Sequence, residues 1–371
     1  MVTALGLDVV TSCAAARAGI SRARDLGDGL GWDEESARAE GTQGHAIPTL
    51  TDGFVGVGRL ARLGVAALQD LAGGVELARW SRLGMVLNVS SGFYLEKQFS
   101  PGPEAPPLDP ELTEGIAAEA ETRRGHIESL LIPTILGLSG VPVVPAARKV
   151  VFGDEVGLIP ALDEARRLLR ERAVDACIVG GIESQLDPEL LFALHALGSV
   201  KTATQPAGRM PGEAAAVLLV EDRSNPNARR APGPLAWIGG LALEVEPKDR
   251  FATSPHTGES LSRSMARTIG DLASTGGTAD LMVGDLTGED FRSQVWGDAY
   301  VRLRASNAAT ASEEWCPALH FGAVGAAAGP VAACMICRGF ARGYGSSGAA
   351  LVWLLSDAGS RASFWVRRAD A

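Results

Sequence analysis

The chain has 371 residues, 46% of them hydrophobic and 5% aromatic, with a formal net charge of −10. This length favours two fused halves over one domain, because single cores stop growing at about 250–300 residues. An excess of 44 acidic over 34 basic residues opposes binding to phosphate backbones, so no nucleic-acid partner is expected.

Five cysteines without framework spacing favour a reducing, cytoplasmic setting over a disulfide-stapled one. No basic and apolar leader opens the sequence, and no run of about 18 uncharged apolar residues occurs. Neither a signal peptide nor a membrane span is therefore expected. The 45 glycines and abundant alanine favour close helix-on-sheet packing and hence an α/β protein.

Strand and helix patterns alternate through the first half of the chain. Apolar periodicity predicts strands at residues 1–7, 83–89, 141–144 and 174–179, and helices at residues 11–24, 59–71, 127–138 and 161–170. Turn-forming composition predicts a loop over residues 26–53, and five prolines in residues 100–112 predict an exposed connection. The pair Gly180-Gly181 is interpreted as a turn into a helix, followed by a strand after Gly212-Glu213.

The second half repeats this alternation. Helices are predicted around residues 260–272 and 291–302. Residues 350–368 are predicted to form two strands joined by a turn at residues 356–359. The sequence ADLMVGDLTG at residues 279–288 echoes VDACIVGGIE at residues 174–183. Such an echo is typical of a duplicated α/β unit, although short buried strands also resemble one another by chance.

Several segments resemble one known family. The run from Gly180-Gly181-Ile182-Glu183 to Gly212-Glu213-Ala214-Ala215 is similar to the middle of the β-ketoacyl synthases of the thiolase superfamily. The opening VTALGLDVVTSCAAARAGI and the closing hairpin are similar to the ends of those enzymes. The resemblance implies a thiolase-like α/β fold with two pseudo-duplicated halves, residues 1–221 and 232–371, in layers ordered αβαβα.

The most specific motif residues are interpreted as structural. Gly180, Gly181 and Gly212 permit close backbone approach. The resemblance implies that Glu213 is a buried structural carboxylate.

The nucleophile of the family is missing. Active members carry an acylated cysteine at a strand-to-helix turn, and the resemblance places Glu155 there, with a register uncertainty toward Asp154 or Val156. A carboxylate is favourable at a helix N-terminus, but an acyl group on it would form a labile anhydride. Glu155 is therefore either a remnant of the catalytic position or simply a helix cap.

The family's auxiliary residues are also altered. His320 matches the second histidine, Asp285 stands where the first is expected, and the lysine falls near Trp315. An anion at Asp285 would oppose the enolate formed on decarboxylation. The candidate remnant site is thus Glu155, Asp285 and His320, with His320 either an acid–base group or a packed pocket residue. No cofactor or metal is expected, since Cys334 and Cys337 lie in an apolar helix without a second pair.

Two functional hypotheses follow. The first is a binding protein, because chain length factors lack the cysteine and act by dimerising with an active ketosynthase. Degenerate thiolase-like proteins of type VI secretion effector clusters are also similar, and the opening segment looks closer to these, which implies an adaptor for a secreted effector. The second is an acyltransferase or condensing enzyme with an altered site. The resemblance implies a homodimer or heterodimer paired through an edge strand at residues 141–144.

Overall fold

Two β-sheets form the centre of the computed structural model, which describes residues 1–27, 31–33, 38–100, 108–223, 233–306, 308, 313–344 and 348–369. The first sheet has the order β6-β5-β7-β8, and the second has the order β11-β10-β12-β13-β9. The strands of the first are β5 (Leu83–Val89), β6 (Ala147–Phe152), β7 (Ala176–Ser184) and β8 (Glu213–Val220). Those of the second are β9 (Ala236–Val245), β10 (Leu281–Val283), β11 (Glu313–Trp315), β12 (Ala349–Leu355) and β13 (Ser360–Arg368).

The two sheets share a pattern of pairing. In the first, β5 is parallel to both β6 and β7, and β8 is antiparallel to β7. In the second, β10 is parallel to β11 and β12, whereas β13 runs antiparallel to both β12 and β9. Each sheet draws all of its strands from one side of residues 221–235. The boundary between two halves stays a prediction.

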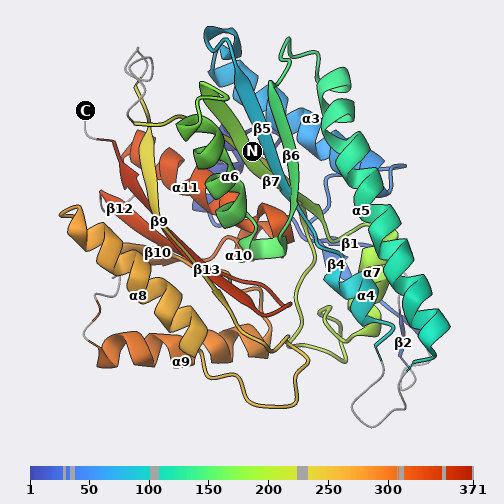
Figure 1. Cartoon of the computed structure of the whole chain (residues 1–371). Coiled ribbons are helices and arrows are strands. Elements are labelled where there is room, and N and C mark those ends of the chain that lie inside the picture. The colour runs from blue at the N-terminus through green and yellow to red at the C-terminus, as the bar shows by residue number, and fades with distance from the viewer. Residues whose placement is uncertain are drawn as a thin grey trace.

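Helices lie on both sides of each sheet and produce five layers (Figure 1). The first sheet contacts α3 (Gly56–Gly74) and α5 (Pro110–Ser139), and the second contacts α8 (Glu259–Ser274), which packs on α9 (Asp290–Ala305). Between the sheets lie α6 (Leu158–Arg170) and α11 (Ala328–Arg342), which contact strands of both. The described residues therefore form αβαβα layers.

The remaining described elements are short. They are the helices α1 (Val9–Arg17), α2 (Pro48–Thr51), α4 (Phe93–Lys97), α7 (Pro188–Ala196) and α10 (Ala318–Phe321), the 3₁₀ turns η1 (Leu77–Arg79), η2 (Asp154–Val156) and η4 (Gly325–Ala327), and the hairpin strands β1 (Arg24–Asp25), β2 (Gly31–Asp33), β3 (Arg38–Glu40) and β4 (Gln43–Gly44). No helix in the described ranges is both long enough and apolar enough to cross a bilayer.

Helix α6 shows how the sequence builds the middle layer. Leu158, Leu162, Ala165 and Leu169 recur at helical spacing and are buried in the core between the sheets. Full burial of each leucine contributes roughly 1.5–3 kcal/mol. Arginines in the last turn are favourable at the negative end of the helix. The start of α6, where functional residues were predicted, is therefore held firmly against both sheets.

The strand predicted at residues 141–144 is wrong. The edge strand of the first sheet is β6, which starts at Ala147. Pro142 lies within the predicted segment and Pro145 follows it directly. Neither proline can donate a ladder hydrogen bond, which explains why pairing begins only after them.

The Gly-Gly turn is also wrong, because β7 continues through Gly180 and Gly181 to Ser184. The predicted strand at residues 1–7 is reduced to two isolated bridges, Val2 with Ala215 and Thr3 with Gly6. The described part of the predicted loop at residues 26–53 contains short strands and α2, and residues 28–30 and 34–37 lie outside the described ranges. In each case long-range contacts rather than local composition decide the backbone.

Candidate functional site

The strand-to-helix turn between β6 and α6 has a tightly specified backbone. Asp154 adopts a left-handed conformation with φ +47°, which is uncommon for a residue other than glycine. Asn88 of β5 holds the turn, since its Nδ2 donates to the Asp154 carbonyl at 2.7 Å and its Oδ1 accepts from Gly153 N at 3.1 Å. A Cβ on Gly157 would lie 1.8 Å from Asn88 Oδ1. The turn thus requires glycine after the acidic pair.

Asp154 is the apex of this turn. Its Oδ1 accepts from Ser91 N at 2.7 Å and from Ser90 Oγ at 3.2 Å, and its Oδ2 accepts from Ser91 Oγ at 2.6 Å. Burial raises the pKa of Asp154 above its ordinary value, although the hydrogen bonds from Ser91 and Ser90 oppose this rise. The apex residue is thus Asp154, which lies within the predicted register uncertainty around Glu155; which of the two stands at the catalytic position stays a prediction.

Glu155 and Asp285 are brought together by a third residue. Arg292, in the first turn of α9, places Nη2 at 2.9 Å from Glu155 Oε1 and Nη1 at 2.6 Å from Asp285 Oδ2. Asp285 Oδ2 also accepts from Leu355 N at 3.2 Å. The arginine side chain is fully buried, so both acids pair with a fixed cation.

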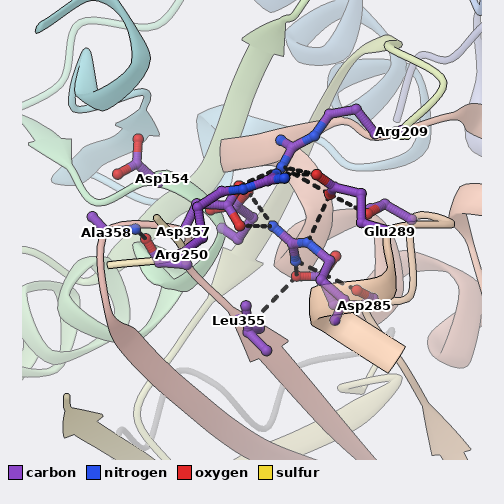
Figure 2. A network of polar contacts seen from close by, with 12 residues as sticks. Asp154, Arg209, Arg250, Asp285, Glu289, Leu355, Asp357 and Ala358 are labelled. Carbon is purple, nitrogen blue, oxygen red and sulfur yellow. Dashed lines mark hydrogen bonds and ion pairs between the residues drawn. The ribbon is translucent and has the colours of Figure 1, made fainter. Parts of the chain in front are cut away.

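Asp357 extends this network into the turn between β12 and β13 (Figure 2). Its Oδ1 lies 3.1 Å from Arg292 Nη2, and its Oδ2 lies 2.5 Å from both Arg209 Nη2 and the Tyr94 hydroxyl. Glu289 completes the group, pairing with Arg209 at 2.8 Å and with Arg250. Arginines and acids from five separate segments therefore meet in one buried cluster.

Burial and ion pairing shift the pKa values of these acids in opposite directions. Burial raises the pKa of Glu155 and of Asp285 above their ordinary values, although Arg292 opposes the rise in both. Burial also disfavours ionised Asp357, but Arg209 and Arg292 outweigh it and hold the pKa of Asp357 well below its ordinary value. The pKa of Glu289 is lowered in the same way by Arg209 and Arg250. Asp357 is the anionic centre of the cluster.

His320 lies apart from these acids. Its Nδ1 is 3.3 Å from the Ile20 carbonyl, and its ring packs edge-on against Phe321. Among the described residues it makes no hydrogen bond or ion pair with Glu155 or Asp285. The structure thus brings two of the three predicted site residues together, through Arg292, whereas His320 on α10 contacts Ile20 and Phe321 instead.

None of the five cysteines has an activated environment. Cys316, four residues before His320, donates its Sγ–H to the Leu286 carbonyl at 3.0 Å, and burial raises its pKa to about 11. Burial raises the pKa of Cys177 to about 12. The pKa values of Cys13, Cys334 and Cys337 are raised for the same reason. These thiols stay protonated near neutral pH and are poor nucleophiles.

The motif residues of the first half lie beside the turn rather than in it. Glu213 Oε1 accepts from Ile47 N at 2.6 Å, and its Oε2 lies 2.9 Å from Arg59 Nη2. A Cβ at each of three motif glycines would lie too close to a backbone carbonyl oxygen. The distance is 2.2 Å from Gly180 to Ala216, 2.0 Å from Gly181 to Ala326, and 2.3 Å from Gly212 to Phe321. These positions leave no room for a side chain.

A small cavity lies at the apex of the turn. Its walls include Ser90, Asp154, Glu155, Glu183, Gln185 and Asp357, and its volume is about 20 Å³. A cavity of this size holds about one water molecule. Sites for small organic ligands usually span several hundred Å³. The space beside residues 154 and 155 is therefore filled by the protein itself.

Several members of this site were missed from the sequence. Arg292, Arg209, Arg250 and Tyr94 carry no motif, and they reach the centre from different elements. A weak signal existed in the spacing of Glu289 and Arg292, which pair three residues apart. Their buried destination depends on how α9 packs, which the sequence pattern does not indicate.

Solved ketosynthase structures are similar to this fold. No protein-family model matches the sequence. One similar chain comes from a solved complex of a type II polyketide acyl-carrier protein with its ketosynthase bound to the hexaketide. It aligns with TM-score 0.72 and 14% identity, over 100% of this chain and 97% of that chain. The ishigamide ketosynthase/chain length factor aligns with TM-score 0.64 and 20% identity over 100% and 97% of the two chains. These alignments confirm the predicted thiolase-like fold.

One curated sequence relative gives a shorter match. The chain is 32% identical over 108 residues to the actinorhodin polyketide putative beta-ketoacyl synthase 2 of Streptomyces coelicolor. The match covers 26% of this chain and 26% of that relative, so the chain spans about a quarter of the relative's length. The protein is ketosynthase-like in fold, with a partial ketosynthase resemblance in sequence.

Proposed function

We propose that this protein is a non-catalytic, ketosynthase-like protein that acts by binding a protein partner. One observation carries the proposal: the apex of the turn bears Asp154 and Glu155, and the neighbouring cavity has a volume of only about 20 Å³. An acyl chain needs far more room than one water molecule. The protonated thiols supply no substitute nucleophile.

We infer that the partner is an active ketosynthase, as for a chain length factor. Two similar solved structures are of a ketosynthase with its carrier protein and of a ketosynthase/chain length factor, which supports this inference. An adaptor role in type VI secretion effector handling is the second candidate, and it rests on the resemblance of the opening segment. Five free cysteines favour a reducing compartment, so we place the protein in the cytoplasm.

The free edge of β6 is the pairing surface that we propose, in place of residues 141–144. Strand β6 ends the first sheet and therefore has unpaired backbone groups that another strand can use. In the segment that precedes β6, the apolar side chains of Leu130, Leu138 and Val144 are 50%, 57% and 84% exposed. A homodimer or a heterodimer formed here would cover these apolar side chains.

Two measurements test this function. Incubation with acyl- and malonyl-carrier thioesters is expected to give no condensation and no decarboxylation. Turnover that disappears in Asp154→Asn or His320→Ala would instead establish the altered-site enzyme. Co-purification with a ketosynthase encoded nearby is expected to yield a stoichiometric complex, and recovery of a secreted effector in its place would favour the adaptor role.

The pairing surface has its own test. Leu138→Asp and Val144→Asp are expected to abolish self- or partner association in sedimentation, because each places a charge in an apolar interface. Leu235→Asp is the matched control, since Leu235 is 65% exposed on the second sheet's side of the molecule. Unchanged association in the first two variants would exclude this edge.

A further inference from the structure

Two acids at the apex cavity have no cationic partner. Asp154 is bound by the hydroxyls of Ser90 and Ser91 and by one amide. Glu183 accepts from backbone amides alone among the described residues, those of Ala326, at 3.5 Å, and Ser184. In the ranges that the structure describes, neither acid forms an ion pair, unlike Glu155 and Asp357, which line the same cavity and pair with Arg292.

Uncompensated charge of this kind is costly. Glu183 is 5% exposed, and moving an unpaired carboxylate out of water carries a large desolvation penalty. Burial and the nearby Asp154 raise the pKa of Glu183 to about 8, which expresses the same unfavourable field. Either a proton or a bound cation must neutralise this pair of acids near neutral pH.

A third side chain points to a ligand rather than to a proton alone. Gln185 lines the cavity, is 4% exposed, and its Oε1 has no hydrogen-bond partner in the described structure. A buried amide oxygen without a donor is destabilising unless something electropositive lies against it. A protonated Glu183 would satisfy one acceptor at most.

We propose that this cavity binds one alkali cation, Na⁺ or K⁺, through the carboxylates of Asp154 and Glu183 and the amide oxygen of Gln185. The volume of about 20 Å³ suits a single ion without its water shell, whereas Mg²⁺ usually keeps several waters. Across the described residues, no group of three or more His, Cys, Asp or Glu side chains has the arrangement of a metal centre. Ca²⁺ takes six to eight oxygen ligands, which is more than two carboxylates and one amide oxygen supply.

The binding is measured on the purified full chain by thermal unfolding. Choline chloride replaces NaCl or KCl at constant ionic strength, so that screening is unchanged. A cation that binds the folded state raises the unfolding midpoint with a saturable dose response. We expect this rise with Na⁺ or K⁺. An equal midpoint in choline chloride, or a rise with Ca²⁺ or Mg²⁺ alone, overturns the proposal.

Two isosteric variants locate the site. In Glu183→Gln and Asp154→Asn the saturable response is expected to disappear, while the midpoint in choline chloride stays the same or rises. Glu259→Gln, which alters an exposed acid paired with Arg263, is expected to retain the full response. A response in Glu183→Gln equal to that of the wild type contradicts the assignment.

Anomalous scattering from Rb⁺ in crystals of the unmodified protein gives a readout that does not depend on any variant folding. A peak inside the cavity supports the proposal, and its absence at saturating Rb⁺ overturns it.

Discussion

Arg292 contacts four carboxylates that come from three parts of the chain. Its guanidinium reaches Glu155, Asp285, Glu289 and Asp357 at 2.6–3.3 Å and is fully buried. Among the described ion pairs, those of Glu155 and Asp285 involve this arginine alone. Removing it leaves several acids buried without a cation, which is the costly way to break a buried ion pair.

The first prediction concerns this arginine. Arg292→Ala is expected to lower the free energy of unfolding by about 3–5 kcal/mol, measured by denaturant titration. Arg263→Ala removes an exposed pair with Glu259 and is expected to cost less than about 0.5 kcal/mol. Similar losses in the two variants would show that the cluster contributes no more than a surface pair.

The second prediction concerns His45, which is 1% exposed. Burial and then nearby His320 lower the pKa of His45 to about 4. Between pH 6.5 and about 4 the unfolded state therefore binds a proton that the folded state does not, so stability falls as the pH falls through this window. The loss amounts to at most about 3 kcal/mol, at 1.36 kcal/mol for each unit of pKa.

The measurement is the free energy of unfolding against pH. His45→Gln is expected to flatten the profile below pH 6.5, and His126→Gln, which changes an exposed histidine of α5, is expected to leave it unchanged. An identical slope in His45→Gln and wild type would show that His45 does not titrate on unfolding.

At the scale of elements, β7 lies where two other segments approach its backbone. Gly181→Ala would place its Cβ 2.0 Å from the Ala326 carbonyl of η4. Because a neighbouring backbone cannot yield as a flexible side chain can, we expect a loss of about 1–3 kcal/mol or more. Denaturant titration of the purified variant measures this loss.

Gly270→Ala is the matched control. Gly270 lies inside α8, and nothing stands within 4 Å of a Cβ placed there. The substitution is expected to stabilise the protein by about 0.5–1 kcal/mol, because alanine is the better helix former. A neutral Gly181→Ala would mean that β7 can move away from η4.

Local pattern predicted the regular elements well and the irregular ones poorly. The strand at 83–89 was predicted with its observed bounds, because the short apolar run is bounded by Arg82 on one side and by the turn-forming residues 90–92 on the other. Helix α5 begins at Pro110, inside the predicted connection, because Asp109 caps it by accepting from Glu111 N at 2.8 Å. Residues 101–107 of that predicted connection lie outside the described residues.

At the scale of the whole molecule, the charged cluster joins the part of the chain that forms the first sheet to the part that forms the second. Glu155 and Arg209 precede residue 221, whereas Asp285, Glu289, Arg292 and Asp357 follow residue 235. The core between the sheets also draws on both sides. We therefore expect one cooperative unfolding transition.

Coincident denaturant curves from circular dichroism and tryptophan fluorescence are the measurement. Both probes are expected to give one midpoint in the wild type. Two separated transitions in the wild type would show that the halves unfold independently and that the cluster does not couple them.

The sequence by itself determined the fold class, because buried strands and glycine motifs are local features that a linear pattern records. The loss of a condensing enzyme's nucleophile stays a prediction from the resemblance. The sequence also placed Glu155 and Asp285 in one site. Only the tertiary structure decided that Arg292 joins those two acids, that His320 lies elsewhere, and that the cavity beside Asp154 is nearly filled. The physical reason is that ion pairing and packing depend on which side chains meet in space, and here they come from segments more than a hundred residues apart.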